Sequence, residues 1–173
     1  MMATIDKAQV TLPSDSEVKV VRSFRAPRAM VYRAYTEPQL LQRWLLGPPG
    51  WSMPVCEMDV RVGGSFRWQW QSDDGAQQFG FSGTFREVQP PARLVHTEAY
   101  DPGTVGGGYP GEPAIVTVTF LEQAGMTTMT TLVDFGSKEA RDGAVATGMT
   151  DGMEQSYQLL DGLLGGDGSL PPR

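Results

Sequence analysis

The feature that most constrains the fold is a long stretch in which apolar and polar residues alternate one by one. Between Trp51 and Phe135 this alternation recurs in about six segments, and short turn sequences such as SDDG (72–75) and QAG (123–125) separate several of them. A period of two places successive side chains on opposite faces of a strand. Because strands that are joined by hairpins pair antiparallel, we expect an antiparallel sheet with one apolar face.

Aromatic residues concentrate on one face of two of these segments, at Phe66, Trp68, Trp70, Phe79, Phe81 and Phe85. The hairpin turn at 72–75 would bring the two aromatic faces side by side. A surface of this kind is either part of the core or the wall of a binding site, and the alternation does not separate these alternatives.

The residues before this stretch predict one strand and two short helices. Glu17 to Arg25 alternates like a strand, and Pro27 suits the first turn of a helix. Thr36 and Gln39 have the spacing of a capping box for a second helix, which the Gly-Pro-Pro-Gly sequence at 47–50 ends. We therefore expect two short helices between the first and second strands.

A long amphipathic helix is predicted at the C-terminal end, from a cap at Ser137 to about Leu164. Gly148, Gly152 and Ser156 recur along it at a spacing of four, so one stripe carries almost no side chains. Glycine inside a helix lowers helix stability by about 1 kcal/mol relative to alanine, so we expect the packing of the helix to require small residues along this stripe. Either the helix lies very close to the sheet, or the stripe leaves a gap for a guest molecule.

Together these elements predict an α+β protein in which a curved antiparallel sheet of about six to seven strands wraps a long C-terminal helix. The 173 residues suffice for one domain with a proper core. We expect a flexible leader at residues 1–15, a single domain at 16–164 and a disordered tail at 165–173.

Composition excludes several classes of partner and site. The net charge of −6 makes nucleic acid an unfavourable partner. No apolar run is long enough for membrane insertion, and the N-terminal residues lack the apolar region of a signal peptide, so we expect a cytoplasmic protein. Cys56 is the only cysteine, which excludes an internal disulfide and a zinc site built from cysteines.

No residue pattern indicates catalysis. His96 is the only histidine and belongs to no motif, so we expect a strand histidine that is partly exposed or hydrogen-bonded. Cys56 shares its face with Met58 and Val60, and these apolar neighbours favour a neutral thiol in the core.

The acidic residues of the strands give no stronger signal. Glu57, Asp59 and Arg61 alternate on one face and predict a solvated ladder of charges. Glu98 and Asp134 are single acids without a visible partner. We therefore expect no catalytic residues, no metal and no cofactor.

Several stretches occur in the order of a known family. They are FRAPRAMVYRAYTEP from Phe24, LLQRW from Leu40, CEMDVRVGGSFRW from Cys56, FSGTFREVQPPARL from Phe81 and GMTDGMEQSYQLLDGLL from Gly148. These stretches and the element order resemble the helix-grip fold of the START and birch-pollen-allergen-like superfamily, also called the polyketide cyclase and lipid-transport superfamily. Within it they resemble the branch named for the activator of heat-shock protein 90 ATPase, in its C-terminal-domain form.

The resemblance implies a non-catalytic protein that holds a small hydrophobic or amphipathic molecule between the long helix and the concave face of the sheet. We expect the ligand to be lined by Trp44, Phe66, Trp68, Trp70, Phe79, Phe81, Met149, Gly152, Met153 and Ser156. Two departures bear on the identity of the ligand: this branch often has tryptophan at the position of Met153, and the loop at 101–113 is unusually long and glycine-rich. That loop is either a lid or a surface loop.

Two other functions stay open. The branch name implies a module that interacts with a chaperone in the stress response. The superfamily also contains enzymes of the cyclase or hydrolase type, which would need His96, Glu57 or Glu98 to point into the cavity. The sequence also leaves open a homodimer.

Overall fold

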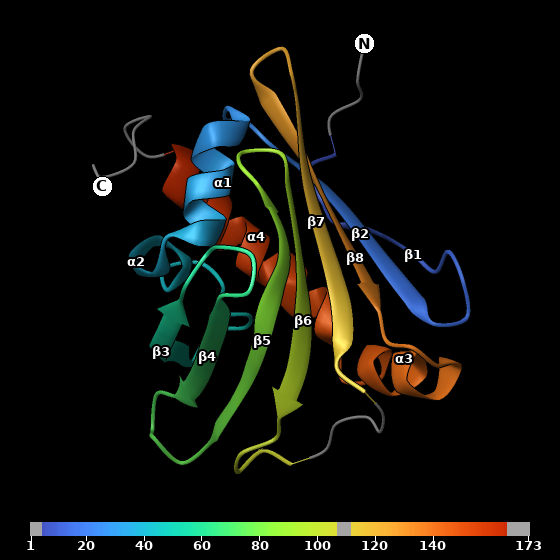
Figure 1. Ribbon diagram of the computed structural model, residues 1–173. Coiled ribbons are helices and arrows are strands. Elements are labelled where there is room, and N and C mark those ends of the chain that lie inside the picture. Colours follow the sequence, from blue (N-terminus) through green and yellow to red (C-terminus); the bar gives the residue numbers. More distant parts are fainter. Residues whose placement is uncertain (1–4, 107–111, 166–173) are drawn as a thin grey trace.

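The structure is a computed structural model that describes residues 5–106 and 112–165, and it has the predicted α+β architecture (Figure 1). Eight strands form one curved antiparallel sheet in the order β1-β2-β8-β7-β6-β5-β4-β3. The strands are β1 (Gln9–Thr11), β2 (Glu17–Phe24), β3 (Trp51–Met58), β4 (Ser65–Ser72), β5 (Gln78–Gln89), β6 (Arg93–Asp101), β7 (Ala114–Gln123) and β8 (Met126–Asp134). The helices are α1 (Arg28–Thr36), α2 (Pro38–Leu41), α3 (Lys138–Val145) and α4 (Met149–Gly165).

The sheet has one strand more than expected, because part of the predicted leader is ordered. β1 pairs antiparallel with β2, with Gln9 opposite Val21 and Thr11 opposite Lys19. The backbone N–H of Ala8 also donates to the carboxylate of Glu154 on α4 at 2.7 Å. Part of the segment that we expected to be a leader thus forms a strand, while residues 1–4 and 166–173 lie outside the described residues.

The two short helices lie between β2 and β3 as predicted, but the capping box is wrong. Thr36 is the last residue of α1, and its hydroxyl donates to the carbonyl of Tyr32 at 2.8 Å. Glu37 takes the N-cap position of α2 and makes no capping hydrogen bond through its side chain. A threonine in a helical turn bonds to the preceding turn instead of capping the next helix.

The predicted C-terminal helix is divided in two. Ser137 caps α3 as expected, since its hydroxyl accepts from the N–H of Ala140 at 3.1 Å. The chain then breaks before α4 at Gly148, whose φ of +83° lies in the left-handed region. Glycine adopts this conformation without a steric penalty, so Gly148 ends one helix and redirects the chain into the next.

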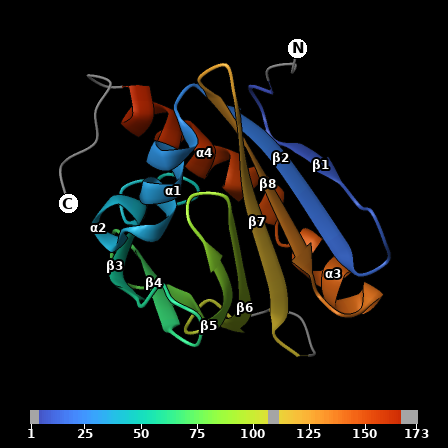
Figure 2. The same ribbon diagram turned by 45° about the horizontal axis from the view of Figure 1, so that its top comes forward.

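Helix α4 crosses one face of the sheet, with α1 and α2 beside its C-terminal half (Figures 1 and 2). Its buried residues Tyr157, Leu160 and Leu164 belong to the main core. The ring of Tyr157 meets Phe24 of β2 edge to face, with 5.6 Å between the ring centroids. The core thus fills the space under this half of α4 and leaves the other half to line a cavity.

Among the described residues, none of the helices combines the length and apolar character that crossing a bilayer requires. The same residues contain no group of three or more His, Cys, Asp or Glu side chains arranged to hold a metal ion.

Candidate functional site

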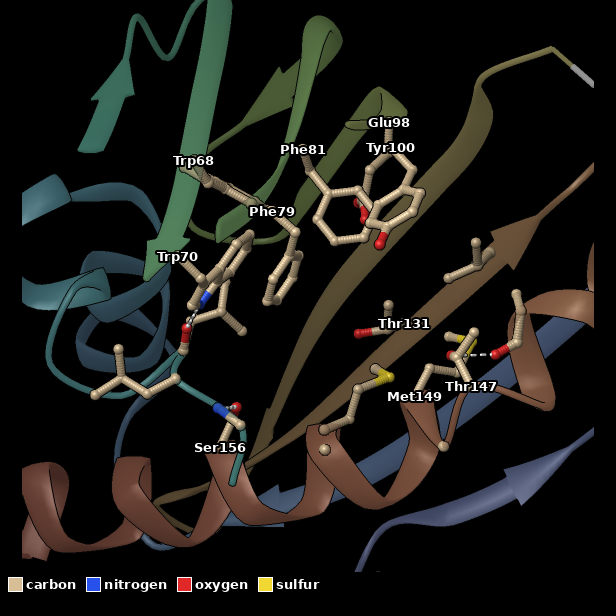
Figure 3. Close-up of a pocket in the computed structure, with 18 of the residues that line it drawn as sticks. Trp68, Trp70, Phe79, Phe81, Glu98, Tyr100, Thr131, Thr147, Met149 and Ser156 are labelled. Atoms are coloured by element: carbon tan, nitrogen blue, oxygen red, sulfur yellow. Dashed lines mark hydrogen bonds between the residues drawn. The ribbon is translucent and has the colours of Figure 1, made fainter. Parts of the chain in front are cut away.

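A cavity of about 430 Å³ lies between the N-terminal half of α4 and the concave face of the sheet (Figure 3). Strands β4 to β8 supply one wall, and α4 with the turn before it supplies the other. The chain that follows α2, at Leu45 to Pro48, closes one end. A space of this size suits a small molecule.

The structure brings nearly all the predicted site residues to this cavity. It is lined by Trp44, Trp68, Trp70, Phe79, Phe81, Met149, Gly152, Met153 and Ser156. Phe66 does not line it: its ring is buried against Phe85 and His96, at centroid distances of 5.6 and 4.9 Å. Although Phe66 faces the same way as Trp68 and Trp70, its part of β4 runs over the filled core. That these residues bind a ligand stays a prediction.

The bare stripe of the C-terminal helix faces open space. A Cβ atom added at Gly148 or Gly152 would meet no heavy atom within 4 Å, and both glycines line the cavity. The stripe therefore does not mark a close approach between helix and sheet. Ser156 belongs to the end wall, where its hydroxyl accepts from the N–H of Gly47 at 2.8 Å.

The aromatic wall is held in fixed orientations by hydrogen bonds and ring stacking. The indole N–H of Trp70 donates to the carbonyl of Leu45 at 2.7 Å, and that of Trp44 donates to Ala34 at 2.9 Å. Trp70 and Phe79 stack at 5.1 Å with only 8° between their ring planes. Such a wall changes little when an apolar ligand arrives, which lowers the entropic cost of binding.

Glu98 lines the cavity although it was not among the predicted ligand-lining residues; the sequence offered it only as a residue that an enzyme would need there. Residues Leu94, His96, Glu98 and Tyr100 alternate on one face of β6, and the last two line the cavity. Glu98 is half-buried, and burial raises the pKa of its carboxyl to about 7. The available signal was its place in the alternation, where a charged residue occupies a position that faces inward.

His96 and Cys56 take no part in the cavity. His96 is fully buried, more so than expected, among the rings of Phe66, Trp68 and Phe85. Its Nδ1 lies 2.9 Å from the carbonyl of Thr97, and burial lowers its pKa to about 4. Cys56 is half-buried, and burial raises the pKa of its thiol to about 11, so the thiol is neutral at physiological pH.

The other charged residues singled out in the sequence lie at the end of β3, in the segment after it and on β8, and none of them lines the cavity. Glu57 pairs with Arg67 at 3.3 Å, and Asp59 pairs with Arg61 at 2.8 Å. Asp134 accepts a hydrogen bond from the N–H of Gly136 at 2.9 Å. The charges are exposed as predicted, but they do not form a ladder on one strand face, because Asp59 and Arg61 lie after the end of β3.

The described part of the 101–113 loop lies at the rim of the cavity. Val105 lines the cavity, and the hydroxyl of Tyr100 donates to the carbonyl of Gly106 at 3.1 Å. Residues 107–111 lie outside the described residues. The function of the loop as a lid stays a prediction.

Comparisons with known proteins bear on the family and the fold of the chain. The model of the family described as activator of Hsp90 ATPase homolog 1-like protein matches residues 25–165. No sequence among curated proteins matches the chain.

Solved structures of similar proteins have the same fold. The chain is similar to a Rhodobacter sphaeroides protein, with 32% identity, 92% of this chain and 99% of that chain covered, and a TM-score of 0.83. A Nitrosomonas europaea protein is 25% identical over 89% of this chain and 97% of its own, with a TM-score of 0.75. An AHSA1-like protein from Aeromonas hydrophila shares the fold at 21% identity, with coverage of 90% and 99% and a TM-score of 0.66.

Proposed function

The chain belongs to the activator of Hsp90 ATPase homolog 1-like family of the START and polyketide cyclase superfamily, and we propose that it is a non-catalytic binding protein for a small hydrophobic or amphipathic molecule. The ligand would lie between α4 and the sheet. The observation that carries the proposal is the open space over Gly152, which separates the helix from the aromatic wall. Apolar walls with few polar groups are typical of small-molecule sites.

The proposal is tested by filling the cavity from the helix. Gly152→Leu places a leucine into the open space, so the affinity for the neutral fluorescent probe N-phenyl-1-naphthylamine should fall at least about tenfold. Gly162→Leu is the matched control, because Gly162 is an exposed glycine of the same helix with no heavy atom within 4 Å of its Cβ position. Both variants gain helix propensity, and only the first changes the cavity.

Equal probe binding by the two variants, or no binding by the unmodified protein, would refute this function. Native mass spectrometry of freshly purified protein adds an independent measurement, since a retained small molecule would appear as a mass difference.

The family description supports interaction with a chaperone as a second candidate function. In this case the protein would stimulate the ATP turnover of Hsp90, and a cavity-filling Gly152→Leu substitution would leave that stimulation intact. An ATPase assay with purified Hsp90 and both leucine variants separates the two candidates.

An enzymatic function has one residue in its favour. Of the three side chains that such a function would need in the cavity, only Glu98 lines it. A carboxyl with a pKa near 7 can exchange a proton with a substrate. Turnover of a cyclase or hydrolase substrate that Glu98→Gln abolishes would establish this alternative.

A further inference from the structure

The cavity contains a carboxyl group without a counter-charge. No lysine, arginine or histidine occurs among the described residues that line it. Within the same part of the chain, Glu98 has neither a hydrogen-bond partner nor an ion-pair partner. A half-buried carboxylate that loses solvent and gains no partner is unfavourable, so a cation brought to it is stabilised.

Aromatic rings surround this carboxyl group. Figure 3 shows Glu98 next to Phe81 and Tyr100, whose ring centroids are 5.3 Å apart. The stacked pair of Trp70 and Phe79 continues the same wall toward α4. Ring faces attract cations through their quadrupoles, and the attraction is strongest where water is excluded.

We propose that the ligand is an amphipathic organic cation, with an ammonium group at Glu98 and an apolar part that extends along Trp70 and Phe79 toward Met149 and Met153. This inference rests on the proposed binding function and specifies its ligand class. A single carboxylate among aromatic rings discriminates by charge: it attracts an amine, tolerates an alcohol and repels a fatty acid.

The pH dependence of binding follows from the groups that face Glu98. The other titratable groups among the described lining residues are the phenols of Tyr35, Tyr100 and Tyr157. Burial raises the pKa of all three above 10, so they stay neutral at physiological pH. Glu98 has its pKa near 7 in the free protein. Affinity for an ammonium ion should therefore rise from pH 6 to pH 8, while affinity for a neutral molecule stays constant.

The experiment uses three probes with the same tail, n-decylammonium, decanol and decanoate, each below its micelle concentration. All four tryptophans line the cavity, so intrinsic fluorescence reports binding directly. At pH 8 we expect decylammonium to bind roughly tenfold to a hundredfold more tightly than decanol, the range of a charge-assisted hydrogen bond, and decanoate to bind most weakly.

Glu98→Gln keeps the shape of the side chain and should remove both the preference for the amine and its pH dependence. Glu57→Gln is the control, because it removes a carboxylate from the exposed face of β3 and should change neither. Equal binding of decylammonium and decanol, or a preference that survives Glu98→Gln, overturns the inference and leaves the binding function standing. If none of the three probes nor N-phenyl-1-naphthylamine binds, the proposed function and the inference fail together.

Discussion

Arg22 is the main polar link between the sheet and α4, and its removal should destabilise the protein strongly. Its guanidinium, on β2, donates to Glu154 at 3.1 and 3.2 Å and to Asp161 at 3.0 and 2.8 Å. The side chain of Arg22 is only 3% exposed, while those of Glu154 and Asp161 are 19% and 47% exposed. The perturbation is Arg22→Met, which keeps the apolar stem and removes the charge.

The expected loss follows from these exposures. Removing one partner of a buried ion pair costs about 3–5 kcal/mol, because the other charge stays buried without compensation. Water can solvate Asp161 and part of Glu154, so we expect a value near the lower limit, about 3 kcal/mol, in the free energy of unfolding. For a domain of this size that corresponds to a decrease in Tm of roughly 6–12 °C.

The assay is urea unfolding of four proteins: the unmodified chain, Arg22→Met, Glu154→Gln and the double variant. The effects of the two single substitutions should sum to much more than the effect of the double variant, because Arg22 and Glu154 share hydrogen bonds. Arg61→Met is the control for loss of a surface pair, since Arg61 and Asp59 are 69% and 51% exposed, and it should cost about 1 kcal/mol or less. A loss for Arg22→Met no larger than that of the control would refute the reasoning.

The pH dependence gives a second measurement on the same link. Burial alone would raise the pKa of Glu154, but hydrogen bonds from Arg22 and Ala8 outweigh it and hold that pKa below 4.5. A lowered pKa in the folded state gives stability that is present above pH 4.5 and lost as the pH falls through the folded value. The difference between the unmodified chain and Arg22→Met should therefore shrink in acid and stay constant from pH 6 to pH 8.

Three further substitutions have definite expected outcomes. Glu98→Gln should stabilise the protein at pH 8 and not at pH 4.5. Burial raises the pKa of Glu98 from 4.5 to about 7, so the folded state loses up to about 3 kcal/mol of stability as the pH rises through this interval. Thermal unfolding at pH 4.5 and pH 8 checks this, and an equal change in Tm at the two pH values would contradict it. His96→Leu should reduce the loss of stability that the protein shows as the pH falls from 6.5 to 4. Because the pKa of His96 is lowered to about 4 in the folded state, the neutral ring contributes stability above pH 6.5, and this contribution disappears as the pH falls to 4. An unchanged acid-unfolding profile would show that His96 does not titrate in this interval. Ser156→Ala leaves the N–H of Gly47 without its acceptor and should lower the free energy of unfolding by about 1–3 kcal/mol in a urea titration, whereas an unchanged midpoint would mean that water replaces the hydroxyl.

The sequence predicted the sheet and its aromatic face well because one local rule determines both. The alternation in β4 and β5 assigns each side chain to a face, and pairing of Trp68 with Phe81 and of Trp70 with Phe79 then follows from the hairpin. What the alternation does not encode is position along the strand. Phe66 shares the face of Trp68, yet only the packing of the other elements decides that one fills the core and the other lines the cavity.

The errors at Thr36 and Gly148 have a common cause. A threonine two residues before a proline fits both the end of one helix and the cap of the next, and a glycine within a helical pattern fits both its interior and its end. The backbone conformation resolves both cases, and it depends on contacts distant in sequence. The same is true of β1, whose three residues form a strand because β2 offers an unpaired edge.

The position of Glu154 has a consequence for the outer surface of the molecule. Glu154 follows Met153 directly, so one turn of α4 presents a flexible side chain to the cavity and a carboxylate to β2 and to the backbone of Ala8. If a guest that contacts Met153 shifts this turn of the helix, we expect the hydrogen bond from the Ala8 amide to Glu154 to change as well. Hydrogen exchange at the backbone amide of Ala8 would then report whether the cavity is occupied, although Ala8 does not line it.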